Sequence, residues 1–552
     1  MAREEKKLEI YKKGEVKNAG FESPSSHSSK AGRVARNGFF SGVLMLSLST
    51  IAVKIIGLVY KIPMLGLLGS EGMGYFNSAY EIYALLCIIS TSGLPVAMSV
   101  MISKSEVQSG ADSIFKVAMR IFLVLGTLGT ALMLVFSYPL ARFLGGDKSF
   151  YCILAIAPTL FFICIVSAYR GYFQGRSQMM PTALSQVIEA LGKLLLGLLF
   201  AYVALSAGLE IEKAAACAVL GLLCGSAISA LCLMLIKRTA RGTPNQIWNR
   251  DEGLRISREL LSVALPITLS AALVSLTKMI DMTMILRRLQ SIGYLSSEAF
   301  SVYGSYTTLC LPLFSLAPTL ASSVSMPILP RLGKAISDRD IQAQTDAVNE
   351  GLCLTSLISM PVSAGLALYS KEILTLLFKN QPEAIELCAP LLTVLSFSVG
   401  LSCLVTYSNA VLQAYGRPSI PLLSMGVGAI VKIVLAYFLI GNESVNIMGA
   451  PISTFFCDLV INLISFACIC KCIPKKISVG KTLVLPFAAA VISVGVSKFL
   501  YGAITARYGE GNLMTAVGIC IAALLYCMLC LVFKIIDPKE IILSRKSDGI
   551  KT

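Results

Sequence analysis

The chain has 552 residues, of which 55% are hydrophobic and only 14% are charged, and its mean hydropathy is +0.76. Because a soluble domain is about a quarter charged, this composition excludes an ordinary soluble fold and indicates a polytopic membrane protein. The single histidine, His27, excludes histidine-based acid–base chemistry, and the 17 scattered cysteines predict neither a disulfide framework nor a metal site. We therefore expect a membrane transporter rather than an enzyme, without a bound cofactor.

Residues 1–36 are rich in Lys, Glu and Ser and predict a disordered tail. Fourteen apolar runs follow, and each can cross hydrocarbon as a helix of roughly 20 residues. Because the runs are continuous rather than alternating, they indicate an all-α fold and not a barrel. The expected spans cover residues 39–62, 74–102, 116–137, 150–169, 181–207, 214–236, 259–284, 302–327, 351–370, 386–412, 420–440, 446–468, 482–501 and 512–534.

An internal repeat divides these spans into two sets. The stretch FQGRSQMMPTALSQ from Phe173 is similar to LQAYGRPSIPLLSM from Leu412, and in each a lysine follows the glutamine by nineteen positions. Facing repeats build the central site of many secondary transporters. We expect two pseudo-symmetric six-helix lobes and two extra C-terminal helices. The predicted boundaries are an N-lobe over 37–236, a cytoplasmic linker over 237–258, a C-lobe over 259–470, the last two spans within 471–535 and a tail over 536–552.

Positive charge is distributed unequally between the two sides of the predicted membrane. Of the 47 Lys and Arg residues, 33 fall on the side of the N-terminal tail, nine fall on the opposite side and five lie inside spans. By the positive-inside rule, this predicts a multi-pass protein of the cytoplasmic membrane with both termini in the cytoplasm. The same rule accounts for the net charge of +16, so we expect no nucleic-acid partner.

Ionisable side chains in or beside the spans are the candidate functional residues. Each costs roughly 2.5 to 3.5 kcal/mol on insertion and by default faces a cavity or a partner. By their depth, Lys54 and Glu81 could meet, and Asp281 follows Lys278 by three positions. The candidate cavity residues are Lys54, Lys61, Glu81, Glu189, Lys193, Lys278 and Lys432, and the candidate coupling-ion residues are Asp281 and Asp458.

Two interpretations of these charges remain open. In the first, Glu189 with Lys193 and Asp458 with Lys432 are neutralised pairs that hold helices together. In the second, the lysines face a cavity and bind an anion. Lys498 lies near the end of its span without a candidate acid, so we expect its side chain to snorkel toward the membrane surface.

Several stretches occur in an order and spacing that are specific when taken together. They are KIIGLVYKIPMLGLLGSEGMGYF at 54–76, SGLPVAMSVMISK at 92–104, RGYFQG at 170–175 followed by MPTALSQVIE, VALPITLS at 263–270 and YGSY at 303–306. Over about residues 37–440 they resemble the polysaccharide-flippase and lipid II flippase branch of the multidrug/oligosaccharidyl-lipid/polysaccharide exporter (MOP) superfamily. The likeness is greatest to the stage V sporulation protein B group and the Gram-positive MurJ-like proteins.

This resemblance implies a two-lobe fold around a central cavity, with the extra helices forming a groove for a polyprenyl tail. It implies a flippase that moves a polyprenyl-pyrophosphate-linked precursor, lipid II or a polysaccharide unit, by alternating access. It places a pyrophosphate-binding cation at Lys54, with Lys61 nearby. Membrane lipids and the cell-wall or spore synthesis machinery are the implied partners. Because no nucleotide-binding motif is present, we expect the energy to come from a Na⁺ or H⁺ gradient or from the membrane potential.

Two other functions remain in view. An ion-coupled multidrug exporter of the MATE type predicts twelve spans and a more acidic cavity. A non-transporting membrane scaffold for envelope or spore assembly predicts that the deep charges only join helices. The Lys54→Ala variant distinguishes a flippase from a scaffold, because unchanged lipid II translocation by this variant would contradict the flippase.

Overall fold

The computed structural model describes seven stretches of the chain. They are residues 28–104, 108–239, 250–325, 328–473, 477–509, 511–533 and 535. Every regular element in these stretches is a helix, which confirms the all-α class. Most of the predicted tail over 1–36, the middle of the predicted linker at 240–249 and the predicted tail over 536–552 lie outside the described residues.

The first helices of the chain pack mainly with one another, and we call them the N-terminal group. Glycines let α8 and α9 approach closely, since a Cβ built on Gly221 would lie 2.2 Å from the backbone nitrogen of Gly197. The group comprises α2 (Ser28–Thr91), α3 (Gly93–Lys104), α4 (Gln108–Val135), α5 (Ser137–Phe143), α6 (Phe150–Ile156), α7 (Thr159–Gly175), α8 (Met179–Ser206) and α9 (Ile211–Thr239).

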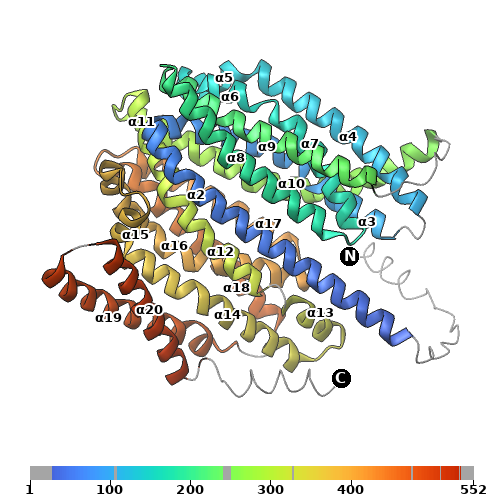
Figure 1. The fold of residues 1–552 in the computed structure, drawn as a ribbon. Coiled ribbons are helices and arrows are strands. Elements are labelled where there is room, and N and C mark those ends of the chain that lie inside the picture. Colours follow the sequence, from blue (N-terminus) through green and yellow to red (C-terminus); the bar gives the residue numbers. More distant parts are fainter. Residues whose placement is uncertain are drawn as a thin grey trace, which may run out of the picture.

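The following helices form the C-terminal group, in which α14 and α18 both pack on α16. The last two helices form a terminal hairpin beside α14 and α15, drawn in red in Figure 1. The C-terminal group comprises α10 (Arg250–Ser291), α11 (Ser296–Ser305), a π turn (Tyr306–Cys310), α12 (Leu311–Ser325), α13 (Leu329–Ser337), α14 (Ile341–Leu368), α15 (Ser370–Leu377), α16 (Pro382–Ala414), α17 (Ser419–Ile440) and α18 (Gly449–Cys472). The terminal hairpin comprises a second π turn (Gly480–Val484), α19 (Leu485–Tyr508) and α20 (Asn512–Val532).

Twelve helices in the described part of the chain are long and apolar enough to cross a membrane, whereas the sequence predicts fourteen. The difference arises at two places. The stretch Leu48–Ser103 counts as one helix although it contains two predicted spans. The two spans meet at Gly69, where the backbone (φ 66°, ψ 179°) leaves the helical region. The helix from α11 to α12 is interrupted by the first π turn. The count of fourteen is therefore not confirmed and stays a prediction.

The two groups touch at one end of the bundle without intervening side chains. Here α2 turns at Gly69 and crosses α11, at the end where Figure 1 shows α5, α11 and α15. A Cβ on Gly74 would lie 2.1 Å from the carbonyl oxygen of Phe300, and one on Gly304 would lie 2.0 Å from that of Ser70. Only glycine permits this approach, which we call the glycine seal.

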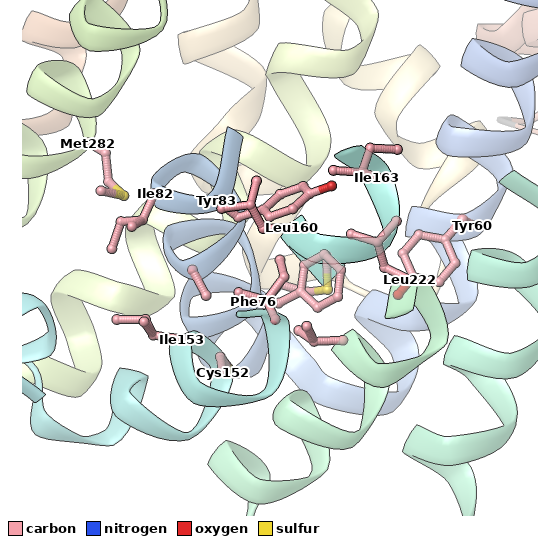
Figure 2. Packing of buried hydrophobic residues seen from close by; sticks show 14 of the residues in the cluster. Tyr60, Phe76, Ile82, Tyr83, Cys152, Ile153, Leu160, Ile163, Leu222 and Met282 are labelled. Atoms are coloured by element: carbon pink, nitrogen blue, oxygen red, sulfur yellow. The ribbon is translucent and has the colours of Figure 1, made fainter. Parts of the chain in front are cut away.

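A second close approach joins the same two groups farther along the chain. A Cβ built on Gly93 of α3 would lie 2.2 Å from the carbonyl oxygen of Ala264 on α10. Between these two approaches, Phe76, Asn77, Tyr80 and Glu81 of α2 line a cavity, as described below. Other side chains around α2 form an apolar cluster that borders the cavity. Figure 2 shows part of it: Tyr60, Phe76, Ile82 and Tyr83 of α2, Cys152 and Ile153 of α6, Leu160 and Ile163 of α7, Leu222 of α9 and Met282 of α10.

Candidate functional site

A cavity of about 680 Å³ lies between the N-terminal and C-terminal groups. Its walls come from α2, α8, α10, α11, α12, α17 and α18, with shorter contributions from neighbouring elements. Seven of the nine predicted site residues line it, namely Lys54, Lys61, Glu81, Lys193, Lys278, Asp281 and Lys432. Glu189 and Asp458 are not among the lining residues. The cavity wall thus carries five lysines against two carboxylates.

Lys54 joins α2 to α12 across the cavity. Its Nζ lies 2.5 Å from the Oγ1 of Thr319 and 3.3 Å from the carbonyl oxygen of Ser315. The expected meeting of Lys54 with Glu81 is not observed, since no ion pair joins them in the described stretches although both line the cavity. Among the described residues, Lys54 is therefore bound by neutral acceptors and not by a carboxylate.

Lys61 lies two turns farther along α2 and also binds a neutral acceptor. Its Nζ donates to the carbonyl oxygen of Thr307, 2.7 Å away in the first π turn. Asn77 of α2 donates to the hydroxyls of Thr307 and Thr308, at 2.9 and 3.0 Å. The π turn is thus held to α2 by a lysine and an amide.

Lys193 is surrounded by aromatic rings rather than by an acid. Its Nζ lies 4.7 Å from the ring centroid of Tyr80, 5.1 Å from that of Tyr60 and 5.5 Å from that of Phe76. Such cation–π contacts stabilise a cation without neutralising it. All three rings belong to α2, so the Lys193 side chain joins α8 to α2 through ring contacts.

The predicted pair of Glu189 with Lys193 is wrong. Glu189 accepts a hydrogen bond from the guanidinium of Arg170 at 2.8 Å, and Arg170 also donates to Ser185. Arg170 lies just after the predicted span 150–169, but α7 continues to Gly175 and brings this side chain beside α8. Glu189, one helical turn from Lys193, therefore forms its ion pair with Arg170.

Lys432 is the exception among the cavity lysines, because it forms an ion pair. Its partner is Asp281 of α10, not Asp458 as the sequence suggested. The Oδ2 atom of Asp458 is buried and has no hydrogen-bond partner among the described residues. Lys278, the expected neighbour of Asp281, forms no ion pair in the described residues. The C-terminal group therefore neutralises one of its cavity lysines.

Lys498 also has a partner that sequence reasoning missed. Its Nζ lies 2.5 Å from Glu372 of α15 and 4.7 Å from the ring centroid of Tyr369. The hydroxyl of Tyr369 is 2.9 Å from that of Ser497. The expectation that Lys498 has no acid partner is wrong, and this cluster joins α19 to the C-terminal group.

Some of the contacts that were not predicted correspond to a pattern in the sequence. Ser315, Thr319 and Ser322 recur at helical spacing within an apolar span, and all three line the cavity. No sequence pattern predicts the rings around Lys193, since aromatic residues are common in buried helices. No group of three or more His, Cys, Asp or Glu in the described stretches could hold a metal ion. The site is suited to binding an anion by charge and hydrogen bonds.

Two family models match the chain. The model described as polysaccharide biosynthesis protein matches residues 39–335, which is more than half of the chain. The MatE model matches residues 266–438.

Curated relatives cover almost the whole chain. Stage V sporulation protein B of Bacillus subtilis (strain 168) is 27% identical over 518 residues, which are 92% of this chain and 98% of that protein. The lipid II flippase MurJ of the same organism is 24% identical over 520 residues, covering 87% and 92%.

Solved structures share the fold. A lipid II flippase MurJ in an inward closed conformation has a TM-score of 0.69 at 13% identity and covers 89% of this chain and 98% of its own. An inward-facing multidrug resistance MATE transporter has a TM-score of 0.60 at 16% identity, covering 78% and 98%. At these identities the structures show the fold alone.

Proposed function

Because this chain belongs to the polysaccharide biosynthesis protein family and is a multi-pass transporter or flippase of the MOP superfamily, we propose that it flips a polyprenyl-pyrophosphate-linked cell-wall precursor across the cytoplasmic membrane. The cargo is lipid II or a polysaccharide repeat unit. The names of the relatives support this cargo class, as does the chemistry of the cavity.

The observation that carries the proposal is the unneutralised positive charge of the cavity. Among the described residues, Lys54, Lys61 and Lys193 contact neutral acceptors and rings and form no ion pair, so these side chains remain available to a ligand. A diphosphate carries several negative charges in a compact group, and ammonium groups bind such anions by charge and donated hydrogen bonds. A cavity that binds cationic drugs would need more carboxylates than lysines.

The two close approaches between the helix groups support alternating access. The glycine seal joins the two groups beside the cavity, and Gly93 against Ala264 joins them a second time. We propose that the seal faces the outside and that both termini lie in the cytoplasm, as the distribution of Lys and Arg suggests. The polyprenyl tail stays in lipid beside the terminal hairpin while the headgroup crosses through the cavity.

Energy for the cycle comes from an ion gradient or from the membrane potential. Asp281 and Asp458 are the proposed coupling residues, because both are intramembrane carboxylates near Lys432. Asp281 already binds the lysine, whereas Asp458 has an oxygen without a hydrogen-bond partner. We propose that a proton or a sodium ion acts here while the anionic cargo occupies the lysine-rich part of the cavity.

The test is complementation of a bacterial strain depleted of its lipid II flippase. Expression of this chain restores growth and makes lipid II accessible at the outer surface, whereas the Lys54→Ala variant reduces both. Lys213→Ala is the matched control, because Lys213 pairs with Glu210 outside the cavity. Normal lipid II translocation by Lys54→Ala would contradict the proposed site. Resistance to cationic drugs without lipid II translocation would favour the multidrug exporter.

A further inference from the structure

The first π turn alters the hydrogen bonding of one cavity residue. In an α-helix the N–H of residue i+4 donates to the carbonyl of residue i, whereas in a π turn the donor is residue i+5. Here the N–H of Leu311 donates to Tyr306, five positions back. In an α-helix the N–H of Leu311 would donate to the carbonyl of Thr307. Here it donates to the carbonyl of Tyr306 instead.

The residue that could replace this donor is a proline. Five positions after Thr307 stands Pro312, which has no N–H. In a regular α-helix the ring of Pro312 would also clash with the carbonyl of Thr308, which gives a physical reason for the widened turn. The carbonyl of Thr307 is thus left without a helical donor on a residue that is only 6% exposed.

Lys61 supplies the missing donor from another helix. Its Nζ lies 2.7 Å from the carbonyl oxygen of Thr307, and Lys61 and Thr307 both line the cavity. An ammonium has three N–H groups, so one can bind this carbonyl while the others remain available to a ligand. The acceptor therefore fixes the direction of a flexible side chain without neutralising its charge.

We propose that Pro312 and the carbonyl of Thr307 are positioning groups that hold the ammonium of Lys61 in the cavity for the anionic headgroup of the cargo. This inference rests on the proposed function, since it concerns the same cavity. Pro312 acts through Lys61 and contributes no donor or charge of its own. Its role is to keep the Thr307 carbonyl free of a helical donor, so that Lys61 is ordered before the anion arrives.

The chain contains its own control for this arrangement. The sequence TLCLP at 308–312 recurs as TLVLP at 482–486, and in the second π turn the N–H of Leu485 again donates five positions back, to Gly480. The residue that corresponds to Thr307 is Lys481, which is exposed and does not line the cavity. The second π turn therefore has the same local sequence and geometry without a cavity lysine to position.

The experiment is a double-mutant cycle on the full chain in nanodiscs, with geranylgeranyl diphosphate as the probe. Pro312→Ala supplies the N–H that Thr307 lacks and weakens binding roughly tenfold, the range expected for loss of a hydrogen bond that orders a charged group. Lys61→Met weakens binding at least as much. The decisive result is that Pro312→Ala has no further effect when Lys61 is already Met.

Pro486→Ala is the matched control and leaves the dissociation constant unchanged. Additive effects of Pro312→Ala and Lys61→Met, or equal weakening by Pro486→Ala, would overturn the positioning role and leave the proposed function intact. Absence of geranylgeranyl diphosphate binding by the unaltered chain would overturn both. Hydrogen exchange over residues 306–313 provides a second readout, since Pro312→Ala increases protection there if the turn returns to α-helix.

Discussion

Lys193 and Lys432 occupy equivalent positions in the two halves of the chain, each nineteen residues after a glutamine, yet they are held in different ways. Lys193 lies among three aromatic rings, whereas Lys432 forms an ion pair with Asp281. The repeat therefore preserved where the lysine lies and not what it contacts. As a result, Lys193 has ring contacts and no acid partner among the described residues, whereas Lys432 forms a neutral pair.

The largest effect is expected from Lys432→Met, which leaves the carboxylate of Asp281 without its partner. Removing one member of a buried ion pair costs about 3–5 kcal/mol. Thermal unfolding in detergent measures this loss. Adding Asp281→Leu to Lys432→Met restores much of the stability, because no unpaired charge remains. A single variant as stable as the unaltered chain would show that Asp281 is well solvated.

A smaller loss of stability is expected from Lys193→Met, because no charge is left unpaired. The cation–π contacts contribute about 2 kcal/mol at most, and methionine still packs against the rings of Tyr60 and Tyr80. The same unfolding assay compares this variant with Lys432→Met. If Lys193→Met destabilised the protein more than Lys432→Met, the proposed difference between the ring contacts of Lys193 and the ion pair of Lys432 would be wrong.

Asp281→Asn makes the two halves more alike by releasing the charge of Lys432. Because the cavity gains a positive charge, geranylgeranyl diphosphate binds more tightly by about 1 kcal/mol, or roughly fivefold. The salt dependence of binding becomes steeper at the same time. Weaker binding would indicate that the Asp281 carboxylate itself contributes to the ligand site.

The smallest effect is expected at Lys498, which combines both kinds of contact. It pairs with Glu372 and lies over Tyr369, and its side chain is one-third exposed. Glu372→Gln therefore lowers stability by about 1 kcal/mol or less. Limited proteolysis after residue 473 tests whether the terminal hairpin loosens; rapid cleavage there would show that the pair matters more than its exposure suggests.

The sequence predicted the fold because a bilayer leaves few alternatives. Long apolar runs form helices there, and the runs, the repeat and the resemblance agree on the MOP fold. The identity of the deep charges was also predictable, since seven of the nine candidate residues line one cavity. Their location in or beside apolar spans was enough for this, because charged side chains in spans turn away from lipid.

The partners of these charges were not predictable. Spacing along one helix suggested Glu189 for Lys193, but the packing of α7 beside α8 brings Arg170 to that acid. The same applies to Asp281 and Lys432, which lie on helices far apart in the sequence. The π turns were missed as well, although TLCLP and TLVLP are visible in the sequence, because an internal proline predicts a kink without specifying its type.

The glycine seal has a consequence for how the cavity opens. Its closest contacts join Gly74 and Gly304 to the opposing backbone, and these contacts contain no titratable group. They therefore depend on shape and dispersion, which respond little to pH or salt. We therefore expect the glycine seal itself to respond little to the pH or the salt concentration of the surrounding medium.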